Sequence, residues 1–186
     1  EAKILIIPNP IPFERNLNNK NFNFTNKKIF TFFGRIHPHK NIEYIIYLFA
    51  KSKLPKDCHL HIYGINDDSE YLVKLKKLIQ ANKNIKIFKS VFGNRKLKIM
   101  NLAWVNILLS KSEVLSFSLL ESGLNGLPTL VNENFYLPKN DTISIKTPSE
   151  EVSIIQKFQE IANWSKTYRD SLFKKSVDFF QQYKNI

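Results

Sequence analysis

The sequence predicts an α/β fold in which a parallel β-sheet is flanked by helices. Short apolar runs, several of which end in glycine, alternate with longer segments whose apolar residues recur every three or four positions. The turns between these segments are short, and this alternation is typical of parallel sheets. The chain has 186 residues, 43% of them hydrophobic, which is enough for one domain with its own core.

The first half of the chain supplies three predicted strands and three predicted helices. The strands cover residues 28–33, 58–63 and 85–88, and the helices begin after Asn41, near Asp67 to Ser69 (ending near Ala81), and at Asn94. Asn, Asp and Ser are residue types that cap helix N-termini. The residues expected to face the core are Ile42, Ile45, Ile46 and Phe49 in the first helix, and Leu72, Leu75 and Leu78 or Ile79 in the second.

The second half continues the pattern. Strands are predicted over 105–109 and 127–131, with a helix over 119–124 between them, and two helices are predicted from Ser149 onward. The inner faces of these last helices are expected to carry Trp164, Tyr168, Leu172, Phe173 and Phe179.

Cysteine and histidine spacing argues against a metal centre. The single Cys58 excludes an internal disulfide and a cysteine metal cluster. His37 and His39 lie in a proline-containing turn, whereas His59 and His61 alternate along a predicted strand, so neither pair has the helical spacing of a zinc site. No apolar run approaches the roughly 18 residues that a membrane span needs.

Three motifs that are typical of common enzyme classes are absent from the sequence. It contains no Gly-x-Gly-x-x-Gly, no Gly-x4-Gly-Lys-Ser/Thr and no Gly-x-Ser-x-Gly motif. Their absence argues against a nicotinamide dehydrogenase, a P-loop ATPase and an esterase, respectively.

The net charge of +12 suits a phosphorylated substrate, an anionic lipid surface or nucleic acid. The lysines are spread evenly along the chain, and no RNA-binding aromatic signature or helix-turn-helix pattern accompanies them. We therefore expect mostly solvated helix faces and no nucleic-acid partner. The lysines of 74–77 and 174–175 leave an anionic membrane surface as a possible partner.

Polar residues follow the predicted strands, where parallel sheets bind their ligands. The first such group is Gly34 and Arg35, with Lys40 just before a predicted helix. Arginine, lysine and a helix N-terminus all favour phosphate oxygens, so a diphosphate would suit this place. A turn carrying two surface cations explains the same residues equally well.

The second group spans residues 110–123, after one strand and into the next helix. Backbone N–H groups near Ser116 to Ser118 can hold a phosphate, and the carboxylates of Glu113 and Glu121 can bind sugar hydroxyls. The alternative is a capping box formed by Ser118 and Glu121, which needs no ligand. Pattern alone favours the capping box for Glu121.

In this order the residues resemble the C-terminal domain of the retaining family 4 glycosyltransferases, which have the GT-B fold. The resemblance covers roughly residues 5–133. The matching segments are Pro8-Asn9, Phe33-Gly34-Arg35 with Lys40, Ile62-Tyr63-Gly64, residues 103–110, Glu113-x7-Glu121, and Gly126-Leu127-Pro128. The resemblance implies a Rossmann-like sheet forming one half of a GT-B fold, with further helices at the C-terminus.

The same resemblance implies an organisation for the whole protein. Residues 1–186 would be a single nucleotide-sugar-binding domain, cut from a longer chain whose N-terminal domain binds the acceptor. The protein would transfer a sugar from a UDP- or GDP-linked donor with retention, in bacterial surface polysaccharide, lipopolysaccharide or glycolipid synthesis. We expect the isolated fragment to be inactive. The resemblance further implies a cytoplasmic location, with docking at the inner face of the cell membrane as one option.

Site residues follow from the resemblance position by position. Arg35 and Lys40 would contact the donor diphosphate, Glu113 the donor sugar and Glu121 the ribose, while residues 90–92 would lie near the base. The implied catalytic residues are Glu113, Arg35 and Lys40, and the implied donor-binding residues are Gly34, Gly64, Val91, Ser110, Ser116, Phe117, Ser118 and Glu121. No metal and no cofactor are expected.

One segment departs from the family pattern. The family has Gly-Phe-Gly after its first glutamate, where this chain has Val114-Leu115-Ser116. A serine side chain can crowd a phosphate that glycine would admit. The departure keeps an alternative open, namely a catalytically inactive module for nucleotide binding or protein interaction.

Overall fold

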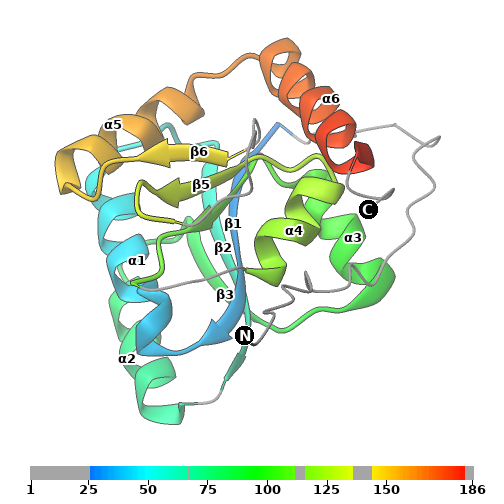
Figure 1. Ribbon diagram of the computed structural model, residues 1–186. Helices are drawn as coiled ribbons and strands as arrows, with labels where there is room; N and C mark the ends of the chain where they lie inside the picture. Colours follow the sequence, from blue (N-terminus) through cyan, green and yellow to red (C-terminus); the bar gives the residue numbers. More distant parts are fainter. Residues whose placement is uncertain (1–25, 67, 112–115, 136–143, 183–186) are drawn as a thin grey trace, which may run out of the picture.

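The computed structural model describes residues 26–66, 68–111, 116–135 and 144–182, and within them it has a six-stranded sheet (Figure 1). All neighbouring strands are parallel, in the order β3-β2-β1-β4-β5-β6. The strands are β1 (Lys28–Ile36), β2 (Cys58–Asn66), β3 (Ile85–Lys89), β4 (Val105–Leu108), β5 (Thr129–Asn132) and β6 (Ser144–Thr147). The predicted α/β class is confirmed. The pattern did not predict β6.

Helices cover both faces of this sheet. They are α1 (Ile42–Lys51), α2 (Ser69–Ile79), α3 (Gly93–Leu102), α4 (Phe117–Leu124), α5 (Glu151–Ala162) and α6 (Lys166–Gln182), with the short 3₁₀ helix η1 (Pro38–Lys40) before α1. Figure 1 shows α1, α2 and α5 on one face, and α3, α4 and α6 on the other. This two-sided cover explains why the central strands are apolar on both faces.

The larger core lies between the sheet and the α1, α2 and α5 layer. Phe30 of β1, Phe49 of α1 and Phe158 of α5 meet edge to face, with ring centroids 5.4 to 6.2 Å apart. Aromatic pairs in this arrangement contribute beyond the area that they bury. The smaller core on the other face contains Phe33 and Tyr63, whose rings stack at 5.2 Å.

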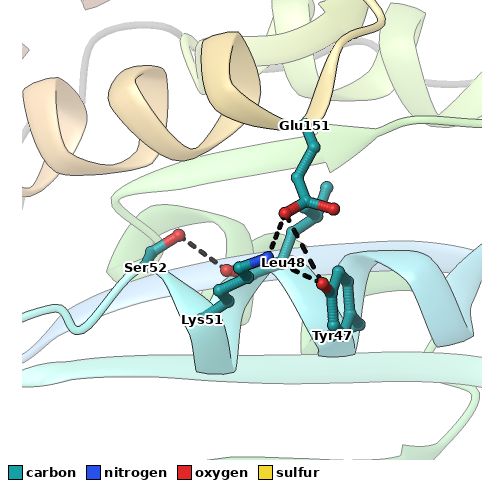
Figure 2. A network of polar contacts seen from close by, with 5 residues as sticks. All are labelled: Tyr47, Leu48, Lys51, Ser52 and Glu151. Carbon is teal, nitrogen blue, oxygen red and sulfur yellow. Dashed lines mark hydrogen bonds and ion pairs between the residues drawn. The ribbon is translucent and has the colours of Figure 1, made fainter.

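An ion pair also joins α1 to α5 at the surface. Figure 2 shows Lys51 of α1 reaching the carboxylate of Glu151, with the hydroxyl of Tyr47 beside both. The hydrogen bond from Lys51 lowers the pKa of the Glu151 carboxyl. Because both side chains are well exposed, the pair adds little to stability, and the aromatic contacts below it hold the helices together.

Helix starts and inner faces follow the sequence pattern with some corrections. Asp68 caps α2 through a hydrogen bond from the amide of Tyr71, as its residue type predicts. The predicted core face of α1 is buried, and so is Leu75 of α2. Of the two alternatives for the last inward residue of α2, Ile79 packs against the core, whereas Leu78 is exposed. One prediction was wrong, because Tyr168 is 47% exposed. The side chain of Phe179 lies outside the described residues.

The N-terminus of α1 differs from its prediction. The helix does begin after Asn41, but Asn41 adopts a left-handed conformation with φ of 56°, and its side chain makes no capping hydrogen bond. Its side-chain amide donates instead to the carbonyl of Leu109, at 3.2 Å. Asparagine is among the few residue types that tolerate this conformation. The side chain thus ties the start of α1 to the end of β4.

Two glycines bring β1 and β2 close together. Strand β1 runs three residues beyond its predicted end, and Gly34 pairs with Gly64 of β2. A Cβ atom on Gly64 would lie 2.5 Å from the carbonyl oxygen of Gly34 and 2.6 Å from Cγ1 of Ile36. No larger residue fits at Gly64 without moving backbone.

A buried arginine fixes α6 to the amino end of the sheet. The guanidinium of Arg169 donates to the carbonyls of Trp104 (2.6 Å), Gly126 (3.1 Å) and Ala103 (3.4 Å), in the turns before β4 and β5. Complete burial lowers the pKa of this guanidinium to about 9, so that it remains charged at neutral pH. The hydrogen bonds offset the cost of removing the charge from water.

We expect Arg169→Met to destabilise the protein by about 2 to 4 kcal/mol, because it leaves buried carbonyl groups without their donor. The measurement is urea-induced unfolding followed by circular dichroism. Lys166→Met is the matched control on the exposed side of α6, with an expected change below about 0.5 kcal/mol. Equal stability of Arg169→Met and the wild type would show that the hydrogen bonds are fully offset by desolvation.

Gly64→Ala is expected to destabilise the protein by about 1 to 3 kcal/mol, because the methyl group overlaps backbone of β1. Gly34→Ala is the matched comparison. Its methyl group would meet only the ring edge of Phe32, at 3.0 Å, so we expect a smaller change in the same unfolding experiment. The reverse order of the two effects would contradict the close packing of β1 on β2.

Candidate functional site

A pocket of about 320 Å³ opens at the carboxyl end of the sheet, between β1 and β4. This position is where the strand order changes direction, since the chain proceeds outward from β1 to β2 and β3, and from β4 to β5 and β6. Parallel sheets form ligand sites at such points. The residues lining the pocket are Phe32, Phe33, Gly34, Arg35, Lys40, Lys96, Leu108, Ser116, Phe117, Ser118 and Glu121.

Seven of the predicted site residues meet in this pocket: Gly34, Arg35, Lys40, Ser116, Phe117, Ser118 and Glu121. Three others do not line it. Gly64 lies beside Gly34 and supports it, Val91 packs in the smaller core, and Ser110 is 4% exposed at the end of β4. Glu113 falls outside the described residues.

Two hydrogen bonds set the position of Lys40. Besides the bond from Asn41 to Leu109, the amide of Lys111 donates to the carbonyl of His39 at 3.1 Å. These bonds join the segment after β1 to the segment after β4. Lys40, which lies between His39 and Asn41, is therefore held at the pocket wall.

The N-terminus of α4 faces the same space. Ser116 is the N-cap residue, and its side chain makes no capping hydrogen bond. Ser116, Phe117 and Ser118 all line the pocket. The first N–H groups of a helix lack partners within the helix and carry partial positive charge, so this end of α4 favours an anion.

The capping-box interpretation of Ser118 and Glu121 is wrong. Ser118 is the second residue of α4 rather than its cap, and its hydroxyl accepts a hydrogen bond from the side-chain amide of Asn106, at 3.3 Å. The helix starts two residues before the capping pattern predicts. Glu121 is thereby left for another partner.

That partner is Lys96 of α3, a residue to which sequence reasoning assigned no role. Its ammonium group forms an ion pair and hydrogen bond with the Glu121 carboxylate, and the two side chains are only 18% and 16% exposed. Lys96 also lies over the ring of Phe33, 5.5 Å from its centroid. The sequence showed a basic helix here, but nothing in it distinguished Lys96 from its neighbours Arg95 and Lys98.

The charges of the pocket are unequal. In the part of the chain that the structure describes, three cationic side chains (Arg35, Lys40 and Lys96) and one carboxylate (Glu121) line it. Together with the N-terminus of α4, this arrangement suits a ligand that combines a multiply charged anion with hydroxyl groups.

The described ranges contain neither a candidate metal centre nor a candidate membrane span. Among those residues, no three His, Cys, Asp or Glu side chains come together in a way that would hold a metal ion. Within the same ranges, no helix combines the length and apolar character that crossing a bilayer demands.

Comparison with known proteins supplies a family. The profile of the family described as "Glycosyl transferases group 1" matches residues 13–139. None of the curated proteins searched matches the chain.

Solved glycosyltransferases share the fold. TarM of S. aureus superposes with a TM-score of 0.71 at 16% identity, over 88% of this chain and 34% of TarM. HepE of Anabaena, solved with UDP and glucose, gives 0.70 at 15% identity, over 84% of this chain and 44% of HepE. WaaG, described as a glycosyltransferase involved in lipopolysaccharide biosynthesis, gives 0.64 at 16% identity, over 83% of this chain and 42% of WaaG.

This chain thus spans between a third and a half of these three proteins. At such low sequence identities, structural similarity shows only that the fold is shared. The family profile covers most of the chain and therefore shows the family to which the chain belongs. The chain belongs to the glycosyl transferases group 1 family, and its six-stranded parallel sheet is one Rossmann-like half of a GT-B fold.

Proposed function

We propose that this chain is the donor-binding domain of a family 4-like glycosyltransferase, the C-terminal half of a longer protein. The enzyme transfers a sugar from a UDP- or GDP-linked donor to an acceptor and retains the anomeric configuration. One observation carries the proposal, namely that the pocket between β1 and β4 combines cations, a helix N-terminus and a carboxylate. The family profile supports sugar transfer, and HepE, which has this fold, was solved with UDP and glucose.

The diphosphate is assigned to the cationic side of the pocket. Arg35 offers a planar fork of donors, Lys40 a compact charge, and α4 the N–H groups of its first turn. When the bond between the anomeric carbon and the diphosphate breaks, negative charge grows on the leaving phosphate. Arg35 and Lys40 stabilise that charge, and in our proposal they do so without a metal ion or cofactor.

The hydroxyl groups of the donor are assigned to carboxylates. Glu121, at the α3 side of the pocket, accepts hydrogen bonds from the ribose, and Glu113 does the same for the donor sugar. In the retaining reaction the acceptor oxygen bonds to the anomeric carbon on the face from which the diphosphate leaves. The acceptor proton passes to the leaving phosphate oxygen, so no charge is left on the new glycoside.

The acceptor is assigned to a part of the protein outside this chain. Bacterial surface polysaccharide, lipopolysaccharide or glycolipid synthesis is the proposed setting, and WaaG, with the same fold, is described as acting in lipopolysaccharide biosynthesis. The proposed location is the cytoplasm, with peripheral docking at the anionic inner face of the membrane through exposed lysines such as those of α2. We expect this chain alone to show no transfer to an acceptor.

One observation favours a second candidate, an inactive nucleotide-binding or interaction module. Ser116 occupies a position where the resembling family has glycine, and it is 6% exposed at the pocket wall. A hydroxymethyl group there narrows the approach of a phosphate to the first turn of α4.

Titration calorimetry with UDP, GDP and their glucose conjugates separates the two candidates. We expect saturable binding to the wild-type chain, and a loss of about tenfold or more in affinity for Arg35→Ala, because a charged hydrogen bond to phosphate is lost. Arg95→Ala is the matched control, since Arg95 is exposed and is not part of the pocket wall.

Two results would contradict donor binding. One is the absence of heat and of chemical-shift change with every nucleotide, for a wild-type chain whose circular dichroism shows it to be folded. The other is an equal effect of the two arginine substitutions, which would place the nucleotide outside the pocket.

A further inference from the structure

Among the described residues, Lys96 is the one cation of the pocket wall that has no part in the function proposed above. It comes from α3, whereas Arg35 lies at the end of β1 and Lys40 in the 3₁₀ helix η1 that follows. Its partner Glu121 is the carboxylate assigned to the ribose. The pairing places Lys96 where it can act on a bound ligand through Glu121.

The ion pair is largely shielded from solvent. The side chains of Lys96 and Glu121 are 18% and 16% exposed, in contrast to 50% and 35% for Lys51 and Glu151 at the surface. Exposed pairs contribute little because water screens them. Shielded, hydrogen-bonded pairs hold their geometry more firmly, and removal of one partner leaves a charge that is poorly solvated.

Lys96 is itself held by two contacts. Its ammonium group lies 5.5 Å from the centroid of Phe33 on β1, in addition to the bond with Glu121 on α4. One side chain of α3 thereby links β1 and α4 at the pocket wall. A glutamate side chain has several rotamers, and a fixed partner reduces the entropy lost when it must adopt one of them.

The charge of the Glu121 carboxylate is a second reason to assign a role to Lys96. Without Lys96 the Glu121 carboxylate would be an unpaired negative charge in a pocket that is to receive a diphosphate, and the two would repel each other. With Lys96 the carboxylate keeps its remaining acceptor sites for hydroxyl groups while its charge is compensated.

We propose that Lys96 is a positioning residue, which holds the Glu121 carboxylate in the orientation that accepts the hydroxyls of the donor ribose. This inference rests on the proposed donor-binding function. Lys96 acts through Glu121 and does not itself touch the phosphates. Its loss should therefore remove recognition of the ribose hydroxyls and leave the rest of the nucleotide contacts in place.

The test compares UDP and GDP with their 2′,3′-dideoxy counterparts by titration calorimetry. For the wild type we expect loss of both hydroxyls to weaken binding about tenfold or more, since they bond to a charged group. For Lys96→Met both nucleotide forms should bind more weakly, because Glu121 then repels the diphosphate, but the ribonucleotide should lose more affinity. The ratio of the two dissociation constants should therefore fall below about threefold. Lys96→Arg retains the charge and should preserve most of the wild-type ratio between the dissociation constants of the dideoxynucleotide and the ribonucleotide.

Two further variants complete the design. Lys98→Met is the matched control, because Lys98 is an exposed lysine of the same helix that does not line the pocket, and its ratio should equal that of the wild type. The double variant Lys96→Met with Glu121→Gln should show the same ratio as Glu121→Gln alone, because Lys96 acts through that carboxylate.

The outcomes separate this inference from the proposed function. Equal loss of affinity for both nucleotide forms in Lys96→Met would mean that Lys96 acts on the diphosphate through its charge alone, and unchanged or tighter ribonucleotide binding would mean that it does not position Glu121. Either result overturns the inference, while Arg35→Ala still tests donor binding. A folded wild type that binds no nucleotide overturns both, and a wild type that binds both forms equally overturns the ribose assignment and this inference alone.

Discussion

The site depends on the central position of β1, which pairs with β2 on one side and β4 on the other. All three strands are parallel, so their carboxyl ends meet at one edge, and the chain leaves β1 and β4 toward opposite faces of the sheet. A gap between the two departing segments follows from that geometry. Arg35, Lys40 and the start of α4 converge on it although Arg35 and Phe117 are 82 residues apart in sequence.

Much of this frame could be predicted from the sequence, because local pattern determines it. The aromatic run of β1 predicts a buried strand, and the periodic apolar residues of α1 predict a helix. Strand β6 was not predicted, since its four residues, Ser-Ile-Lys-Thr, carry too few apolar side chains to show a pattern. The two segments that hold the seven predicted pocket residues follow predicted strands, whose carboxyl ends share one edge, and the family resemblance then implied the individual residues.

The ion pair in the pocket and the anchoring of α6 could not be predicted, because they depend on contacts between distant segments. Lys96 and Glu121 are 25 residues apart, and Arg169 reaches carbonyls 43 to 66 residues away. The capping box failed for a related reason. Ser118 fits the local pattern, but Asn106 of β4 uses its hydroxyl and α4 begins at Phe117.

The placement of Arg169 has a consequence for how such a domain can diversify. Its hydrogen bonds fix α6 at the turns before β4 and β5, whereas the pocket lies beyond the opposite ends of the sheet strands. The groups that secure the C-terminal helix and those that select a ligand are thus separated by the length of the strands. Substitutions that alter the pocket need not weaken this anchor, so ligand specificity can change during evolution or be redesigned in the laboratory on an unchanged scaffold.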